Sequence, residues 1–271
     1  MTPYTFPLEN IFLSDKLTAI VVFFLGLCIG SFLNVCICRI PEGRSIVSPP
    51  SACPRCGHRL RWWENIPLLS YVFLWGRCSG CNDKISIQYP LVELLTALIS
   101  LGIWNRYGLS VQGLIMFGFS CSLIVVAFID LAHKIIPDAI SIPGILLGII
   151  ASFSLPGITW LDSLLGIVVG GGILYLVTWG YYLATKRIGM GGGDIKLLAM
   201  IGAFLGWQAI PFVIFLSAIT GSIIGTLFIL INKKGRHFQI PFGPFLALAA
   251  EIHIFFGQEI LNLYLSGFSH P

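Results

Sequence analysis

The chain has 271 residues, of which 56% are hydrophobic and 10% are charged, and its mean hydropathy is +0.89. A soluble domain carries about 25% charged residues, so this composition excludes an ordinary soluble protein and predicts a multispanning membrane protein. The net charge is +4. In a membrane protein the location of charge matters more than its sum, so nucleic acid is not an expected partner.

Nearly charge-free runs follow one another along the chain, and about 20 apolar residues cross a bilayer as a helix. Eight such runs predict an all-α polytopic membrane protein. The first is expected to be a retained span, because residues 1–16 lack the basic region of a signal peptide and no small-residue cleavage site follows. The runs cover approximately residues 17–38, 91–105, 110–129, 139–157, 161–183, 194–208, 210–231 and 240–265.

Basic residues predict the orientation of these spans. If residues 39–90 are cytoplasmic, fourteen of the sixteen lysines and arginines fall inside, and only Lys16 and Arg106 fall outside. Cytoplasmic loops carry an excess of such residues. The distribution therefore predicts eight spans with both termini outside.

Small residues recur four positions apart within these runs. In a membrane, small faces let helix backbones approach closely and gain packing contacts. We therefore expect these glycines to form helix contacts. The pairs are Gly26 and Gly30, Gly144 and Gly148, Gly166 and Gly170, Gly202 and Gly206, and Gly221 and Gly225.

A polar segment between the first two runs contains two Cys-x2-Cys pairs. Cys53 and Cys56 are separated by 21 residues from Cys78 and Cys81, which is close to the spacing of a zinc ribbon. Two disulfides are the alternative, but the predicted cytoplasmic location favours free thiols. We expect a structural Zn²⁺ site, because four thiolates leave no open position for a catalytic water.

Two aspartates are predicted to reach the cytoplasmic face. Asp130 ends the third run and Asp194 begins the sixth, directly after Gly191-Gly192-Gly193. Two carboxylates in a poorly solvated site can share one proton, which is the chemistry of an aspartic protease. The alternative is that both aspartates only cap helix ends.

Neighbouring residues could support such a dyad. Gly191 and Gly193 would allow unusual backbone conformations or the close approach of a substrate strand. Lys196 faces either lipid headgroups or the dyad. Asp138, which follows a proline, is expected to cap the fourth span.

Several separate motifs resemble those of the bacterial type IV prepilin peptidases. They run in order from about Gly30 to Leu205, and their number makes the resemblance specific. They are Gly30-Ser31-Phe32-Leu33-Asn34-Val35 with Arg39 and Pro41, the two cysteine pairs, Asn65-Ile66-Pro67 with Ser70, Tyr89-Pro90-Leu91-Val92-Glu93, the stretch from Asp130 to Asp138, and Gly191-x-Gly-Asp-x-Lys.

The resemblance implies a bifunctional enzyme of the bacterial inner membrane. Such enzymes cleave the basic leader of type IV prepilins and type II secretion pseudopilins on the cytoplasmic face, and then methylate the new N-terminus with S-adenosylmethionine. Carried over, the catalytic pair is Asp130 and Asp194, and the zinc ligands are the four cysteines. The implied division is residues 1–38 for the N-terminal segment and first span, 39–90 for the zinc-binding module, and 91–271 for the peptidase domain.

Methyl transfer has weaker candidates in Glu64, Asn65 and Glu93. Their structural alternatives are a turn at Asn65 and a cap or ion pair at Glu93. Two other functions remain open at this point. A proton-coupled or ion-coupled transporter would use intramembrane acids as relays, and a non-enzymatic assembly factor would use the zinc module for docking.

Overall fold

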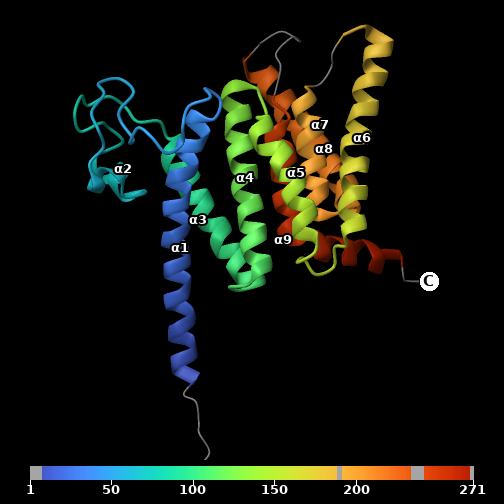
Figure 1. Cartoon of the computed structure of the whole chain (residues 1–271), viewed down its shortest axis with the longest axis horizontal. Helices are drawn as coiled ribbons and strands as arrows, with labels where there is room; N and C mark the ends of the chain where they lie inside the picture. The colour runs from blue at the N-terminus through green and yellow to red at the C-terminus, as the bar shows by residue number, and fades with distance from the viewer. Residues whose placement is uncertain (1–7, 188–190, 233–240, 269–271) are drawn as a thin grey trace, which may run out of the picture. The chain divides into compact units, whose positions relative to one another are not determined.

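The computed structural model describes residues 8–187, 191–232 and 241–268 (Figure 1). The expected basic residues Lys233, Lys234 and Arg236, and both ends of the chain, lie outside these ranges. The chain forms two compact units, Met1–Cys36 with Ser45–Gly113, and Ile37–Arg44 with Leu114–Pro271. We describe each unit separately.

The predicted all-α class is confirmed over the described residues, and each expected run forms a helix. Four helical segments, Asp15–Arg39, Val111–His133, Trp160–Thr185 and Trp207–Phe228, are long and apolar enough to cross a membrane, and two shorter apolar helices cover Asp138–Ser152 and Gly243–Gly257. The helices are α1 (Leu8–Arg39), α3 (Gln88–Tyr107), α4 (Val111–His133), α5 (Asp138–Ser152), α6 (Trp160–Thr185), α7 (Gly192–Leu205), α8 (Ile210–Asn232) and α9 (Gly243–Phe268).

In the first unit, glycines bring α1 against α3 as the sequence predicts. A Cβ on Gly30 would lie 2.6 Å from the Cα of Glu93, and one on Gly26 would lie 2.7 Å from the Cα of Ala97. The Ser100 hydroxyl on α3 donates to the Val22 carbonyl of α1 at 3.2 Å. The polar segment between these helices contains the short helices η1 (Trp62–Asn65) and α2 (Leu69–Phe73).

The core of the second unit is α7, which packs against α5 and α6 (Figure 1). Every residue of α7 from Leu197 to Leu205 is buried. Gly166 of α6 and Gly202 of α7 meet backbone to backbone, so that a Cβ on either would collide with the other's carbonyl oxygen. On the α5 side, a Cβ on Gly148 would lie 2.6 Å from the Cβ of Ala203.

The helices α4, α8 and α9 complete this unit. Phe119 of α4 stacks on Phe204 of α7 with ring centroids 4.3 Å apart. A Cβ on Gly221 of α8 would lie 3.3 Å from the ring of Phe245 on α9. The Ser120 hydroxyl on α4 donates to the Glu251 carboxylate on α9 at 3.2 Å, which is a polar contact between two apolar helices.

Asp138 does not cap α5, and this expectation was wrong. Pro137 is the N-cap residue, and Asp138 is the first residue of the helix without a side-chain cap. Its carboxylate instead accepts two hydrogen bonds from Lys196 Nζ, at 2.7 and 2.8 Å. A charged partner on a neighbouring helix therefore replaces the local capping bond.

The glycine contacts predict a sharp difference between two positions on α6. Gly166→Ala should lower the melting temperature of the purified protein by several degrees, because overpacking a tight contact costs about 1–3 kcal/mol. Gly172→Ala is the matched control, since a Cβ there meets nothing within 4 Å. Thermal unfolding in one detergent compares the two. Equal melting temperatures would contradict the packing described for α6 and α7.

Candidate active site

Asp130 and Asp194, the two predicted catalytic carboxylates, come together in the second unit. Asp130 lies in the last turn of α4 and is 5% exposed, and Asp194 lies in the first turn of α7 and is 9% exposed. The carboxylate of Asp130 lies close enough to Asp194 to oppose its negative charge. Two buried like charges disfavour full ionisation of both groups, so the pair favours a state that holds one proton.

Each carboxylate lies beside the backbone N–H of a glycine at the start of a helix. The backbone N–H of Gly243, the first residue of α9, donates to Asp130 Oδ2 at 2.9 Å. The backbone N–H of Gly191, the N-cap residue of α7, lies near the Asp194 carboxylate and favours its negative charge. Helix N-termini carry unpaired donors and partial positive charge. The two helix starts therefore stabilise negative charge where the aspartates meet.

The glycines before Asp194 differ in what the structure demands of them: Gly191 has an ordinary backbone conformation, whereas Gly193 has no room for a side chain. Gly191 has φ −73° and ψ 145°, an extended conformation that other residues adopt. A Cβ on Gly193, however, would lie 2.8 Å from the Cβ of Ile136, in the segment that joins α4 to α5. The predicted close approach is therefore present, but the neighbour in the structure is Ile136.

Gly243 is a site residue that the sequence analysis missed. A Cβ at this position would lie 2.7 Å from Asp130 Oδ2 and 3.2 Å from Ile136 Cδ1. The signal available in the sequence was Gly243-Pro244 before an apolar run, since proline favours the first turn of a helix. That signal marks the start of a helix, but it does not reveal which carboxylate the helix meets.

Lys196 forms an ion pair with Asp138 that links α7 to the first residue of α5. The two side chains are 41% and 58% exposed. An exposed pair of this kind contributes about 0–1 kcal/mol, so its main effect is to orient the two helix starts. The structure thus gives Lys196 a defined partner beside the segment that carries Ile136.

The four predicted metal ligands cluster in the first unit. Their sulfur atoms all lie within 4.8 Å of one another, and Cys53 Sγ to Cys81 Sγ and Cys56 Sγ to Cys78 Sγ both measure 3.9 Å. None of the four forms a disulfide. A tetrahedral zinc site with Zn–S bonds of about 2.3 Å requires S···S separations of about 3.8 Å. The cluster could therefore hold a metal ion.

Two similar turns build this cluster. In the first, the Cys53 N–H donates to the His58 carbonyl and the Gly57 N–H donates to the Cys53 carbonyl, at 2.9 and 3.0 Å. In the second, Cys78 pairs in the same way with Asp83 and Asn82, both at 2.8 Å. Gly57 and Asn82 occupy equivalent positions and both have positive φ, 71° and 58°. Glycine and asparagine are the residues that tolerate this conformation best.

Glu64 joins the two turns. Its carboxylate accepts hydrogen bonds from the Arg61 N–H at 2.8 Å and the Ser79 hydroxyl at 2.5 Å, and lies 3.0 Å from His58 Nε2. The Arg61 N–H and the Ser79 hydroxyl lower the pKa of Glu64 to about 2. Glu64 is therefore ionised at neutral pH and holds both cysteine turns in place.

The other two candidates for methyl transfer are Asn65 and Glu93. Asn65 is the exposed last residue of η1, as expected for a residue at a turn. Glu93 does not cap the start of α3. It lies in the second turn, is 7% exposed, and accepts a hydrogen bond from the Leu68 N–H at 2.8 Å.

Comparisons with known proteins identify the family of the chain. Residues 24–107 match the bacterial peptidase A24 N-terminal domain, and residues 117–226 match the type IV leader peptidase family. A relative from Pseudomonas putida, named prepilin leader peptidase/N-methyltransferase, is 40% identical over 90% of this chain and 93% of its own length. A relative of the same name from Pseudomonas aeruginosa is 40% identical over 89% of this chain and 91% of its own length. Another from Myxococcus xanthus is 44% identical over 80% of this chain and 65% of its own length. No solved structure matches the chain.

The thiol cluster predicts the metal content of the purified protein. We expect about one zinc ion per chain by elemental analysis, and loss of most of it in Cys53→Ser, because three thiolates bind the ion more weakly than four. Cys121→Ser is the matched control, since Cys121 lies on α4 outside the cluster. Equal zinc content in all three proteins would contradict the assignment of these ligands.

Proposed function

Because this chain belongs to the type IV leader peptidase family, we propose that Asp130 and Asp194 cleave the leader peptide of prepilins and pseudopilins. The observation that carries this assignment is the meeting of two buried carboxylates, from α4 and α7, each held by a helix N-terminus. The same enzyme then methylates the new N-terminus. Among the relatives named above, none supports the transporter alternative.

The chemistry follows from one proton shared by two carboxylates. The ionised aspartate takes a proton from water, and the water oxygen attacks the scissile carbonyl carbon. The protonated aspartate donates a hydrogen bond to the carbonyl oxygen as negative charge develops there. When the C–N bond breaks, the leaving amine takes a proton from the dyad. The proton positions belong to the pair rather than to one residue.

The residues around the two aspartates position the catalytic carboxylates. Gly243 and Gly191 fix the orientation of the two carboxylates, and Gly193 leaves room for Ile136 beside them. Lys196 acts through its ion pair with Asp138, which holds the start of α7 against the start of α5. These are positioning roles, and the two aspartates alone act on the substrate.

The cysteine module serves the methyl-transfer step. Zn²⁺ would be held by Cys53, Cys56, Cys78 and Cys81 and would stabilise the two turns, and S-adenosylmethionine supplies the methyl group. We assign Glu64 to shaping the module, because its carboxylate is already engaged by both turns. Glu93 positions Leu68 at the start of α2, and exposed Asn65 remains available to the substrate amine or the methyl donor.

The proposed orientation in the membrane rests on the distribution of basic residues along the sequence. We place the helices α1 and α3 to α9 across the bacterial inner membrane, with the ends that carry Asp130, Asp194 and Gly243 facing the cytoplasm. Fourteen of the sixteen basic residues then lie on the cytoplasmic side, as the positive-inside rule requires. A prepilin whose basic leader stays in the cytoplasm would present its cleavage site at that face.

Replacement of either aspartate should strongly reduce leader cleavage without loss of the fold. Asp130→Asn and Asp194→Asn should each lower kcat/KM by about 10²–10⁴-fold, the usual contribution of general acid–base catalysis. A synthetic prepilin N-terminal peptide, followed by mass in detergent, provides the measurement. Asp162→Asn is the matched control, because Asp162 is an exposed carboxylate in the first turn of α6 that contacts Trp207 beyond the far end of α7. Wild-type cleavage by either dyad variant would overturn the assignment.

The same variants separate the two activities. With a precleaved peptide and S-adenosylmethionine, both aspartate variants should still transfer the methyl group. Loss of methylation together with cleavage would contradict two separate sites.

Gly243→Ala tests the backbone donor to Asp130. The added Cβ would lie 2.7 Å from Asp130 Oδ2, so the carboxylate must move, and a displacement of about 1 Å can cost 10²-fold in rate. We expect kcat for cleavage to fall while methylation of a precleaved peptide is unchanged. Gly118→Ala on α4 is the control, because its Cβ would meet nothing within 4 Å. An unchanged kcat in Gly243→Ala would remove Gly243 from the site.

A further inference from the structure

One continuous segment of the cysteine module exposes an unusual amount of apolar surface. Seven large apolar side chains in residues 62–76 are between 36% and 88% exposed. Contiguous apolar surface of this kind marks a binding site for protein, ligand or membrane. The seven are Trp62, Trp63, Ile66, Leu69, Val72, Phe73 and Trp75.

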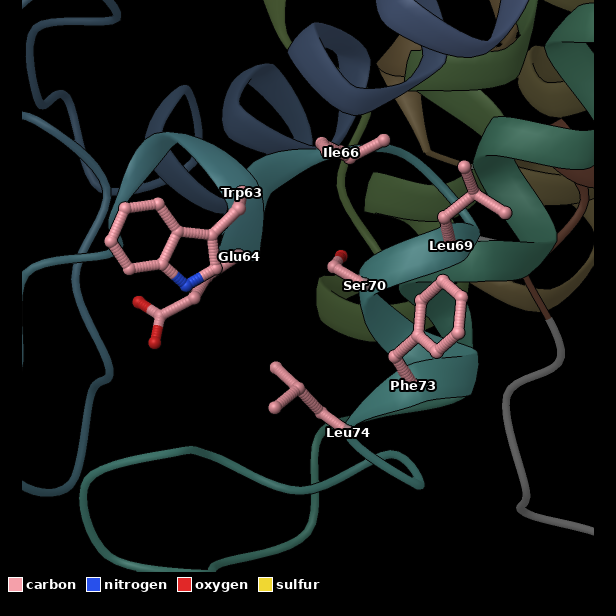
Figure 2. Close-up of a pocket in the computed structure, with 7 residues that line it drawn as sticks. All are labelled: Trp63, Glu64, Ile66, Leu69, Ser70, Phe73 and Leu74. Carbon is pink, nitrogen blue, oxygen red and sulfur yellow. The ribbon is translucent and has the colours of Figure 1, made fainter.

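We call residues 62–76 the apolar segment. One charged residue lies within it, and two arginines flank it. Its one charged residue, Glu64, is 9% exposed and engaged by the cysteine turns. Glu64, Leu69 and Phe73 all line a hollow of about 290 Å³. Figure 2 shows the Glu64 carboxylate turned away from Leu69 and Phe73. Arg61 and Arg77 flank the apolar segment and are exposed, and the Arg61 guanidinium lies 5.2 Å from the centre of the Trp63 ring.

A specific contact fixes the start of α2 beside α3. The Leu68 N–H donates to the Glu93 carboxylate at 2.8 Å. Leu68 has φ 58° and ψ −49°, and the Leu69 N–H bonds back to the Pro67 carbonyl at 2.6 Å. This is close to a γ-turn geometry that is rare for a non-glycine residue. The strained turn indicates that surrounding contacts determine where α2 begins.

That contact places α2 at the level of a lipid-facing surface. Glu93 lies five residues after the start of α3, about 8 Å along the helix at a rise of about 1.5 Å per residue. At the same level, α3 exposes a stripe of leucines at helical spacing, which is typical of a face toward lipid. The stripe consists of Leu91, Leu94, Leu95 and Leu98. The contact with Glu93 therefore sets α2 at the same level along α3 as these exposed leucines, and α2 exposes apolar side chains of its own at that level.

We propose that the apolar segment lies in the cytoplasmic leaflet of the membrane, with its tryptophans at the headgroup level. Tryptophan is enriched at membrane–water interfaces, and arginines at the edges of apolar surface extend their charged ends to lipid phosphates. Insertion of apolar side chains is the main interaction, because the four thiolates of a zinc site would add negative charge to the module. The phospholipid is the partner, and the polar cysteine turns remain in water.

Acyl-chain photolabelling tests this placement directly. The full-length zinc-containing protein is placed in nanodiscs of phosphatidylcholine and phosphatidylglycerol that contain a lipid with a diazirine in the upper acyl chain. After illumination, adducts are mapped by mass spectrometry without substrate or methyl donor. We expect adducts in residues 62–75 at a yield similar to that of the leucine stripe, and at least about tenfold lower yield in the cysteine turns, residues 53–60 and 78–84.

A double variant and the addition of ligands test whether the labelling comes from lipid contact. Phe73→Ser with Trp75→Ser should reduce labelling of the apolar segment several-fold while zinc content and labelling of the leucine stripe are unchanged. Absence of adducts in residues 62–75, with the stripe labelled, would overturn the proposal. Labelling that disappears on addition of S-adenosylmethionine or a precleaved peptide would also overturn it, because the surface would then be a ligand site.

Discussion

Burial of two carboxylates at one place is the constraint on which the second unit depends. Within the described residues, no lysine or arginine forms an ion pair with Asp130 or Asp194, and the negative charges of the two aspartates oppose each other. The fold compensates with backbone N–H groups: that of Gly243 at the start of α9 donates to Asp130, and that of Gly191 at the start of α7 favours the negative charge of Asp194. The end of α4 and the starts of α7 and α9 must therefore lie close together. The close contacts of α7 with α5 and α6 hold its first turn in this position, which relates the glycine packing in the core directly to the chemistry at its end.

The first unit is constrained differently, because its cysteine module is too small to bury much apolar surface. Its order comes from a cluster of four thiols and from Glu64, which joins two similar cysteine turns. A structural zinc ion contributes about 10–16 kcal/mol to the folding of such modules. The apolar side chains that a larger domain would bury remain exposed along one segment, and a bilayer would cover them. Metal and membrane would thus together replace the missing core.

Local patterns in the sequence were sufficient for the helices, the thiol cluster and the presence of both aspartates at one end of the second unit. Run lengths, Cys-x2-Cys spacing and the distribution of basic residues are readable without tertiary contacts. The contacts that orient the side chains were not readable, because they join distant positions. The Gly243 donor lies 113 residues from Asp130, and Lys196 lies 58 residues from Asp138. For the same reason, the engagement of Glu64 by both cysteine turns could not be inferred from its position in the sequence.

The most direct test of this account is whether residues 130 and 194 are neighbours in the membrane. A chain that carries Asp130→Cys and Asp194→Cys, with Cys28, Cys36, Cys38 and Cys121 replaced by Ser, is treated in native membranes with a short bifunctional thiol reagent. Cleavage of the chain between the two positions should leave the fragments covalently joined. The chain with Asp130→Cys and Asp162→Cys is the control and should separate into fragments. Separation of the 130/194 chain, with efficient joining of the control, would contradict a shared site for the two carboxylates.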